Sequence, residues 1–312
     1  MSASLEPQAV DLPSGVGQSI RPGDVLDVIP AVPPDTIPEI PEVKRKIDFT
    51  FWLSAFWIAL MVFAALFATI LPLADPSAQI YEPLAGISTA HLMGTDAVGH
   101  DLFSQVVNGA RISMLVAFAS VASGLLIGGT IGLISGYAKG VISGVLMWIV
   151  DVLLAFPALV FALALVSFAG SSLRSVVLVI AVLAIPGYAR VSRALTLTYA
   201  NQNFVMAARA IGATHWRLVV REVLPNVIVP LASFAALAAA IAIIAEGALA
   251  FLGLSAPGSI SWGNMISQGQ AQLADGPLPA LAPMIAMFLT ILSLNFIGER
   301  LGAVLDPREG QL

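Results

Sequence analysis

Long apolar runs separated by short polar or glycine-containing breaks fill most of the sequence after residue 50. Each of these runs is long enough for a helix to cross a bilayer, which takes about 20 residues. There are six such runs, with approximate bounds 51–71, 113–135, 141–169, 175–196, 226–253 and 279–299. The pattern predicts an all-α fold, a polytopic bundle of six transmembrane helices within a domain spanning residues 48–304.

The composition supports a membrane protein rather than a soluble globule. Of 312 residues, 58% are hydrophobic and only 11% are charged, which leaves too few charges to cover a water-exposed surface. We therefore expect much of the apolar surface to contact lipid. Four small residues in the second run, Gly124, Gly128, Gly129 and Gly132, should let neighbouring helices approach closely, as small residues do in membrane bundles.

The two ends of the chain differ from this apolar part. Residues 1–47 hold eight prolines and seven acidic residues, so they cannot bury enough apolar area to offset ordering, and we predict a disordered tail. The tail ends at the basic residues 44–46, directly before the first apolar run. A cleaved signal peptide is disfavoured because its apolar core would be shorter and closer to the N-terminus. Residues 305–312 are expected to form a short C-terminal tail.

The distribution of Lys and Arg predicts the orientation, because basic residues are retained on the cytoplasmic side during insertion. An even number of spans puts both termini on one side, and a cytoplasmic N-terminus leaves only Arg111 and Arg174 outside. The cytoplasmic set is then Arg21, Lys44, Arg45, Lys46, Lys139, Arg190, Arg193, Arg209, Arg217, Arg221, Arg300 and Arg308. We therefore predict cytoplasmic termini and a multi-pass membrane protein.

Several kinds of chemistry lack the residues that they need. No lysine lies in a Gly-x-x-x-x-Gly-Lys-Ser/Thr loop, so the chain holds no phosphate-binding loop of that type, and no His-Glu-x-x-His helix is present. The scattered basic residues form no stripe typical of nucleic-acid binding, and the absence of Cys removes thiol chemistry. We expect no catalytic residue, no cofactor and no metal in this chain.

Two sets of polar residues remain as candidates. His91, Asp96, His100 and Asp101 lie together in the first outer linker, where they are either metal ligands or ordinary residues of a solvated or interface loop. Asp151 and Glu246 fall inside the third and fifth runs, where burying a carboxylate costs about 3 kcal/mol. They either line an ion or proton pathway or bond to a neighbouring helix as structural contacts.

The segment 197–225 between the fourth and fifth runs is the most informative. Asn203 is expected to cap a short helix containing Ala207, Ala208 and Ala210, and Gly212 to end it. Leu224-Pro225 then marks the start of the next span. Such a helix presents small residues that fit a groove on another protein, although an ordinary amphipathic interfacial helix would share the pattern.

These residues resemble the inner-membrane permease subunits of ATP-binding-cassette importers. Ala207-Ala208, Gly212 and Leu224-Pro225 match the cytoplasmic Glu-Ala-Ala loop of that family. The dipeptide/oligopeptide/nickel branch is indicated by further motifs: Leu92–Asp101, Gly109–Ser113, Asp151–Pro157, Phe251–Leu254, Ser261–Met265 and Leu305–Pro307. The resemblance covers about residues 50–308. Met206 replaces the usual Glu of the loop, and His100 replaces a more common Arg.

The resemblance implies a permease subunit that moves peptides by alternating access. It also implies that a cytoplasmic loop couples this subunit to an ATPase. The residues of this loop are Met206, Ala207, Ala208, Arg209, Ala210, Ile211, Gly212, Leu224 and Pro225. The resemblance further implies a second homologous permease, two cytoplasmic ATPases that bind ATP and Mg, and an extracytoplasmic solute-binding protein. Nickel chelates or other small solutes are alternative substrates in the same branch. An autonomous secondary carrier using Asp151 and Glu246 is the alternative from another class.

Overall fold

The computed structural model describes residues 49–305, and the regular elements in that part are helical apart from one antiparallel bridge between Thr95 and Asp101. The predicted tails lie outside the described residues. The long helices are α2 (Phe49–Phe67), α3 (Leu102–Tyr137), α6 (Leu173–Ala200), α9 (Leu224–Phe251) and α11 (Leu278–Leu305). The shorter helices are α4 (Val141–Ala155), α5 (Ala158–Ala169), α7 (Asn203–Ala210), α8 (His215–Arg217), the π-helical turn η2 (Leu218–Val223), α10 (Trp262–Gly269) and the 3-10 turn η3 (Gln270–Gln272).

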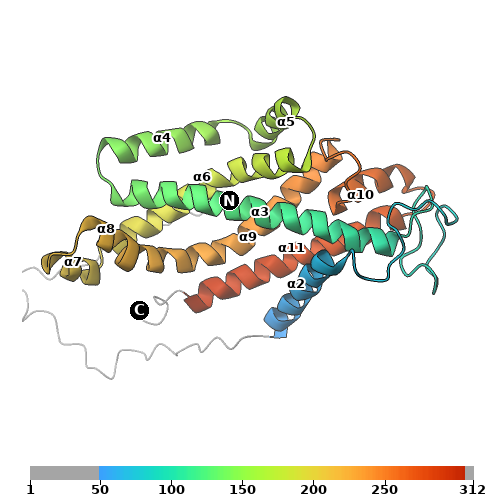
Figure 1. Cartoon of the computed structure of the whole chain (residues 1–312), viewed down its shortest axis with the longest axis horizontal. Coiled ribbons are helices and arrows are strands. Elements are labelled where there is room, and N and C mark those ends of the chain that lie inside the picture. The colour runs from blue at the N-terminus through green and yellow to red at the C-terminus, as the bar shows by residue number, and fades with distance from the viewer. Residues whose placement is uncertain (1–48, 306–312) are drawn as a thin grey trace, which may run out of the picture. The chain divides into compact units, whose positions relative to one another are not determined.

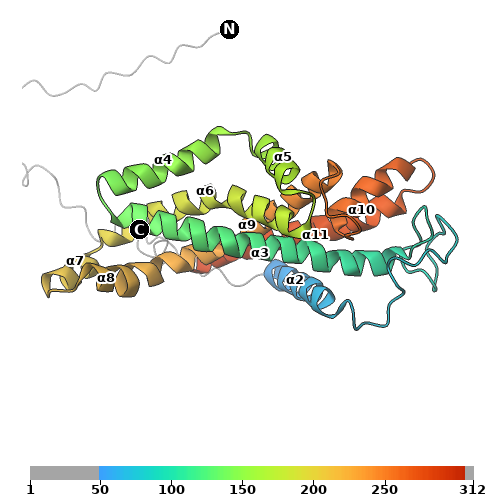
Figure 2. The ribbon, with the colours of Figure 1, turned by 45° about the horizontal axis from the view of Figure 1, so that its top comes forward.

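Five of the six predicted spans are confirmed as single apolar helices long enough to cross a membrane. The predicted third span, residues 141–169, is wrong as a single helix. It breaks into α4 and α5, which meet at an angle of 91° (Figure 2). The reason is Pro157, which cannot donate the backbone hydrogen bond that a continuous helix needs and disfavours helical geometry at Phe156. By length and composition, residues 49–305 therefore contain five candidate spans, or six if the bent pair counts as one.

The segments between spans contain more structure than the sequence suggests. Asp101 caps α3 by accepting a hydrogen bond from the Ser104 amide, so the second span begins at Leu102, well before the predicted residue 113. The predicted outer linker after α9 contains α10, which Ser261 caps by bonding the Asn264 amide. Figure 1 shows α7 and α8 at one end of the long helices, and α10 with the 68–101 loop at the other.

Glycines set how closely α3 and α6 approach. A Cβ atom at Gly128 would overlap the Ile185 carbonyl oxygen, and one at Gly132 would overlap the Ala189 carbonyl oxygen. Gly124 follows the same pattern, since its Cβ would lie 2.7 Å from that of Ala184. Gly129 differs because its nearest neighbour would be an ordinary 3.6 Å away. The close-approach prediction is thus confirmed for three of the four glycines.

Two residues of the predicted cytoplasmic set lie within the fourth predicted run. Arg190 and Arg193 are in the C-terminal part of α6, ten and seven residues before its end at Ala200. The remaining basic residues keep the predicted asymmetry in the same direction, and the cytoplasmic placement of the termini stays a prediction.

Candidate functional site

The short helix α7 occupies the centre of the segment that the sequence singled out. The backbone N–H groups of Val205 and Met206 both donate to the Gln202 carbonyl at 3.1 Å, so Gln202 is the N-cap and Asn203 is already helical. The prediction that Asn203 caps this helix is therefore wrong. It follows that Met206 stands one position later than a capping box requires, and a carboxylate there would not complete one.

The end of α7 is fixed by Gly212, as predicted. Gly212 has a φ of +88°, a left-handed conformation in which a side chain would be strained. Its N–H donates to the Arg209 carbonyl, and the Ala213 N–H donates to the Ala208 carbonyl. These two bonds form a Schellman motif, which satisfies the last carbonyls of the helix and reverses the chain.

The two sides of α7 have different surroundings. Val205 is fully buried, and Ala208 packs against the main apolar core. The opposite side is open to the surroundings and is formed by Met206, Ala207, Ala210 and Ile211, which we call the coupling face. Ile211 is 85% exposed, more than the other large apolar residues of this segment, Phe204, Met206 and Trp216. The predicted small-residue surface is therefore divided, with Ala207 outside and Ala208 inside.

The coupling segment is held against the long helices by polar and apolar contacts. Tyr137, the last residue of α3, makes a hydrogen bond of 2.9 Å between its Oη and Nδ1 of His215 in α8. Leu218 and Val223 of η2 are fully buried, and Leu224-Pro225 begins α9 as predicted. A displacement of α7 can therefore reach two spans, α3 and α9.

Asp151 makes an ion pair with Arg190. The Asp151 Oδ1 and Arg190 NH2 atoms lie 2.7 Å apart, joining α4 to α6. Both side chains are 57% exposed, so the pair is not enclosed by this chain. A cavity of about 320 Å³ surrounds it. The sequence signalled the carboxylate but not its partner, because Arg190 is 39 residues away.

Glu246 occupies a different environment where three helices meet. It is 4% exposed in α9, and Ser113 of α3 donates a hydrogen bond of 3.4 Å to its Oε2. The Ser261 hydroxyl at the start of α10 also bonds this carboxylate. The Trp262 amide in turn donates to Ser113 Oγ, and the Trp262 indole donates to the Val106 carbonyl at 2.9 Å. These bonds join α9 to α3 and to the start of α10, an arrangement that fits the structural alternative for Glu246.

The four polar residues of the outer linker form two separate pairs. His91 Nδ1 lies 3.2 Å from Asp101 Oδ1, and His100 Nδ1 lies 2.6 Å from Asp96 Oδ2. Asp101 also caps α3, so these pairs hold the loop on the helix. Among residues 49–305 no group of three or more His, Asp or Glu side chains has a metal-binding arrangement.

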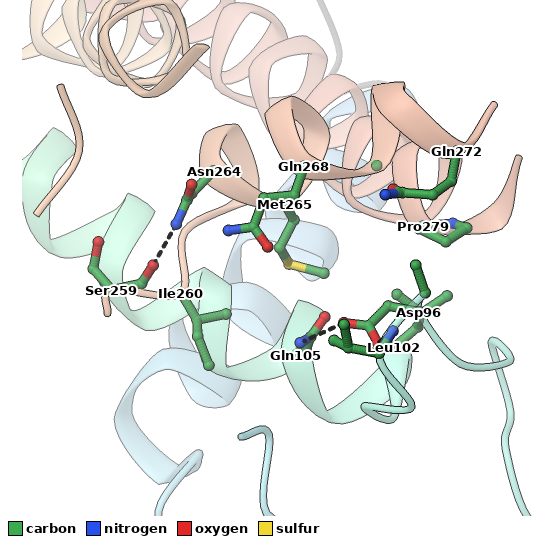
Figure 3. Close-up of a pocket in the computed structure, with 13 residues that line it drawn as sticks. Asp96, Leu102, Gln105, Ser259, Ile260, Asn264, Met265, Gln268, Gln272 and Pro279 are labelled. Atoms are coloured by element: carbon green, nitrogen blue, oxygen red, sulfur yellow. Dashed lines mark hydrogen bonds between the residues drawn. The ribbon is translucent and has the colours of Figure 1, made fainter. Parts of the chain in front are cut away.

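The same loop contributes to a small polar pocket of about 110 Å³ beside α10 (Figure 3). Gln105 Nε2 donates to Asp96 Oδ2 at 3.3 Å, and Asn264 Nδ2 donates to the Ser259 carbonyl at 2.7 Å. Four of its lining residues are thus joined in two hydrogen-bonded pairs. Nearby, hydrogen bonds from Ser77 lower the pKa of the exposed Asp75 carboxyl by stabilising its charged form.

The long apolar helices, the small-residue packing and the paired intramembrane charges together define a polytopic α-helical membrane protein. Comparison with known proteins makes this more specific. Residues 128–311 match the family described as binding-protein-dependent transport system inner membrane component. The chain belongs to this family and is a multi-pass permease subunit of the bacterial inner membrane.

Curated relatives share much of the sequence. The chain is 37% identical over 224 residues to a glutathione transport system permease protein of Pectobacterium atrosepticum, covering 72% of this chain and 74% of the relative. It is 36% identical to a dipeptide transport system permease protein of Alkalihalophilus pseudofirmus, covering 72% and 74%. The similarity to the glutathione permease of Escherichia coli O157:H7 is 34% and extends over 91% of this chain and 96% of that one.

A solved structure supports the fold. A chain of the inward-facing MetNI methionine ABC transporter superposes with a TM-score of 0.55 at 18% identity, covering 66% of this chain and 98% of the other. At this identity the likeness shows the fold alone.

Proposed function

We propose that this chain forms one half of the membrane pathway of an ATP-driven importer for peptides or small peptide derivatives. The family supplies the transport role, and the relatives named above are glutathione and dipeptide permeases. The expected partners are a second homologous permease, two cytoplasmic ATPases that bind ATP and Mg, and a solute-binding protein outside the membrane. In this proposal the chain itself catalyses no covalent reaction.

The coupling face carries the proposal. It combines exposed apolar side chains, including Ile211 at 85% and Met206 at 53%, with a backbone fixed by the Schellman motif. Exposed apolar groups on a rigid element are typical of a surface that another protein covers. The bond between Tyr137 and His215 and the burial of η2 provide a mechanical connection from this surface to α3 and α9.

The mechanism that follows is alternating access. Closure of the ATPase pair would move α7, and the movement would pass through η2 into α9 and through His215 into α3. A π-helical turn often accompanies functional sites and is less regular than an α-helix. The η2 turn lies between α8 and α9, so its backbone can change conformation when α7 moves and pass the movement on to α9.

An Ile211→Asp substitution tests this assignment. Because the side chain is 85% exposed, the change should leave folding intact while placing a charge in the contact with the ATPase. Burying an unpaired charge is costly, so we expect at least a tenfold loss of ATPase association, or about 1.4 kcal/mol. The measurement is co-purification of the ATPases with the tagged permease, together with substrate-stimulated ATP hydrolysis in proteoliposomes.

Val141→Asp is the matched control. Val141 is 80% exposed at the first position of α4, where the helix dipole favours a carboxylate, and it lies outside the coupling face. It should co-purify the ATPases as the wild type does. Normal association and stimulated hydrolysis in Ile211→Asp would contradict the docking assignment, and equal losses in both variants would attribute the effect to added charge in general.

A further inference from the structure

The Asp151–Arg190 ion pair indicates which face of α4 and α6 avoids lipid. Both side chains are 57% exposed, although each lies inside an apolar helix pair or span. Ionisable side chains at membrane depth face protein or a water-filled cavity because their transfer to hydrocarbon is costly. The exposed side of this ion pair must therefore face water or another subunit.

The cavity beside the ion pair contains a second guanidinium. It is lined by Met147, Asp151, Arg190, Arg193, Ala194 and Leu197. The Arg193 Nε atom is buried and has no hydrogen-bond partner among the described residues. Arg193 also makes no ion pair among the described residues, so the charge of its guanidinium is uncompensated beside the cavity. Two guanidinium groups against one carboxylate also give the cavity an excess of positive charge.

The break between α4 and α5 lies close to the ion pair, although it does not line the cavity. Asp151 stands one turn before the end of α4 at Ala155, and α5 leaves at 91°. The last carbonyls of α4 therefore lack helical partners within the apolar region. Interrupted backbone at membrane depth is tolerated where it is buried in protein or lines a water-filled cavity. The negative end of the α4 dipole favours a cation there.

We propose that the cavity between α4 and α6 binds the charged termini of a zwitterionic solute during passage. The carboxylate of the solute binds Arg190 and Arg193, and its ammonium binds Asp151. When the solute binds, the ion pair between Asp151 and Arg190 is replaced by ion pairs between these residues and the solute, so that neither side chain is left without an opposite charge. This inference rests on the proposed function, since it places a peptide-like solute in the permease.

The first test is access of water to the cavity, and the absence of Cys from the chain makes it direct. In the assembled complex with its partner subunits, Ala194→Cys should react rapidly with a charged thiol reagent. Thr130→Cys is the control, because Thr130 is exposed on α3 seven residues before the end of its helix, and Ala194 lies six residues before the end of α6. Reaction of Ala194→Cys no faster than that of Thr130→Cys would overturn the proposal.

The second test is protection by solute. A mixture of di- and tripeptides should slow labelling of Ala194→Cys in a saturable way, whereas the same mixture with amidated C-termini should not. Adding Arg193→Gln should raise the half-protecting concentration about tenfold, the effect of losing one charge-assisted hydrogen bond, and Arg193→Lys should restore part of it. Equal protection by free and amidated peptides would overturn the site.

These measurements separate the inference from the function on which it rests. If the complex assembles and couples ATP hydrolysis to uptake but peptides give no protection, the binding site is wrong and the proposed function stands. If the ATPases fail to associate with the wild-type chain, the proposed function is wrong whatever the labelling shows.

Discussion

Replacing Gly128 by Ala should separate α3 from α6 and destabilise the protein. The added Cβ would overlap the Ile185 carbonyl oxygen and lie 2.9 Å from the Tyr188 Cβ. Carbon atoms pack best at about 3.5–4.0 Å, so the two helices would have to move apart by roughly 0.6–1 Å. Neither obstacle is the flexible end of a side chain, which leaves displacement of the helices as the main way to relieve the overlap.

Gly129→Ala is the matched control because it makes the same chemical change one residue later. Its new Cβ would meet nothing closer than 3.6 Å. Both variants gain about 1 kcal/mol of helix propensity, so that gain cancels in the comparison. The remaining difference is the overpacking cost of about 1–3 kcal/mol. For a protein of this size it corresponds to a midpoint roughly 2–6 °C lower for Gly128→Ala.

The assay is thermal inactivation of the purified complex, followed as the loss of its size-exclusion peak after heating at one fixed rate. A fixed rate is needed because membrane complexes often unfold irreversibly, which makes the midpoint depend on the scan. Membrane abundance measured beforehand shows whether either variant fails to insert. Equal midpoints for the two variants would refute the close approach of α3 and α6 on which the reasoning depends.

Three further predictions concern orientation, the N-terminal segment and Glu246. An Arg209→Cys variant should react with an impermeant thiol reagent only in inverted vesicles, and labelling in sealed cells would overturn the predicted topology. Deleting residues 1–40 should leave insertion and transport nearly unchanged, because a Pro-rich acidic segment supplies little packing. The basic residues 44–46, which orient the first span, remain in this variant. Loss of membrane insertion would contradict the prediction. Glu246→Leu should lower stability by about 1–3 kcal/mol, since the Ser113 and Ser261 hydroxyls lose their acceptor, whereas Glu246→Gln should retain most of it. Thermal midpoints of these two variants would show the difference, and equal midpoints would argue against the structural role.

The features that follow from local chemistry were predictable from the sequence. Five spans follow from the length of apolar runs, and the end of α7 follows from Gly212, because only glycine enters its left-handed conformation freely. The N-terminus of α7 was missed for a related reason. Asn203 has a strong capping preference, but α7 begins one residue earlier, with Gln202 as its N-cap. In this register Val205 is fully buried against the core.

The contacts that define the candidate sites required the tertiary structure. The sequence showed two costly carboxylates in apolar runs, but it gave no reason to pair Asp151 with Arg190 or Glu246 with Ser113. The bend at Pro157 could have been suspected from that residue, whereas its size depends on how α5 packs against α6. Apolar length and turn chemistry are properties of neighbouring residues, so the sequence by itself determined that this protein spans a membrane and where its helices run. Which side chains meet depends on how those helices pack against one another, and only the folded arrangement of α3, α4, α6, α9 and α10 decided that.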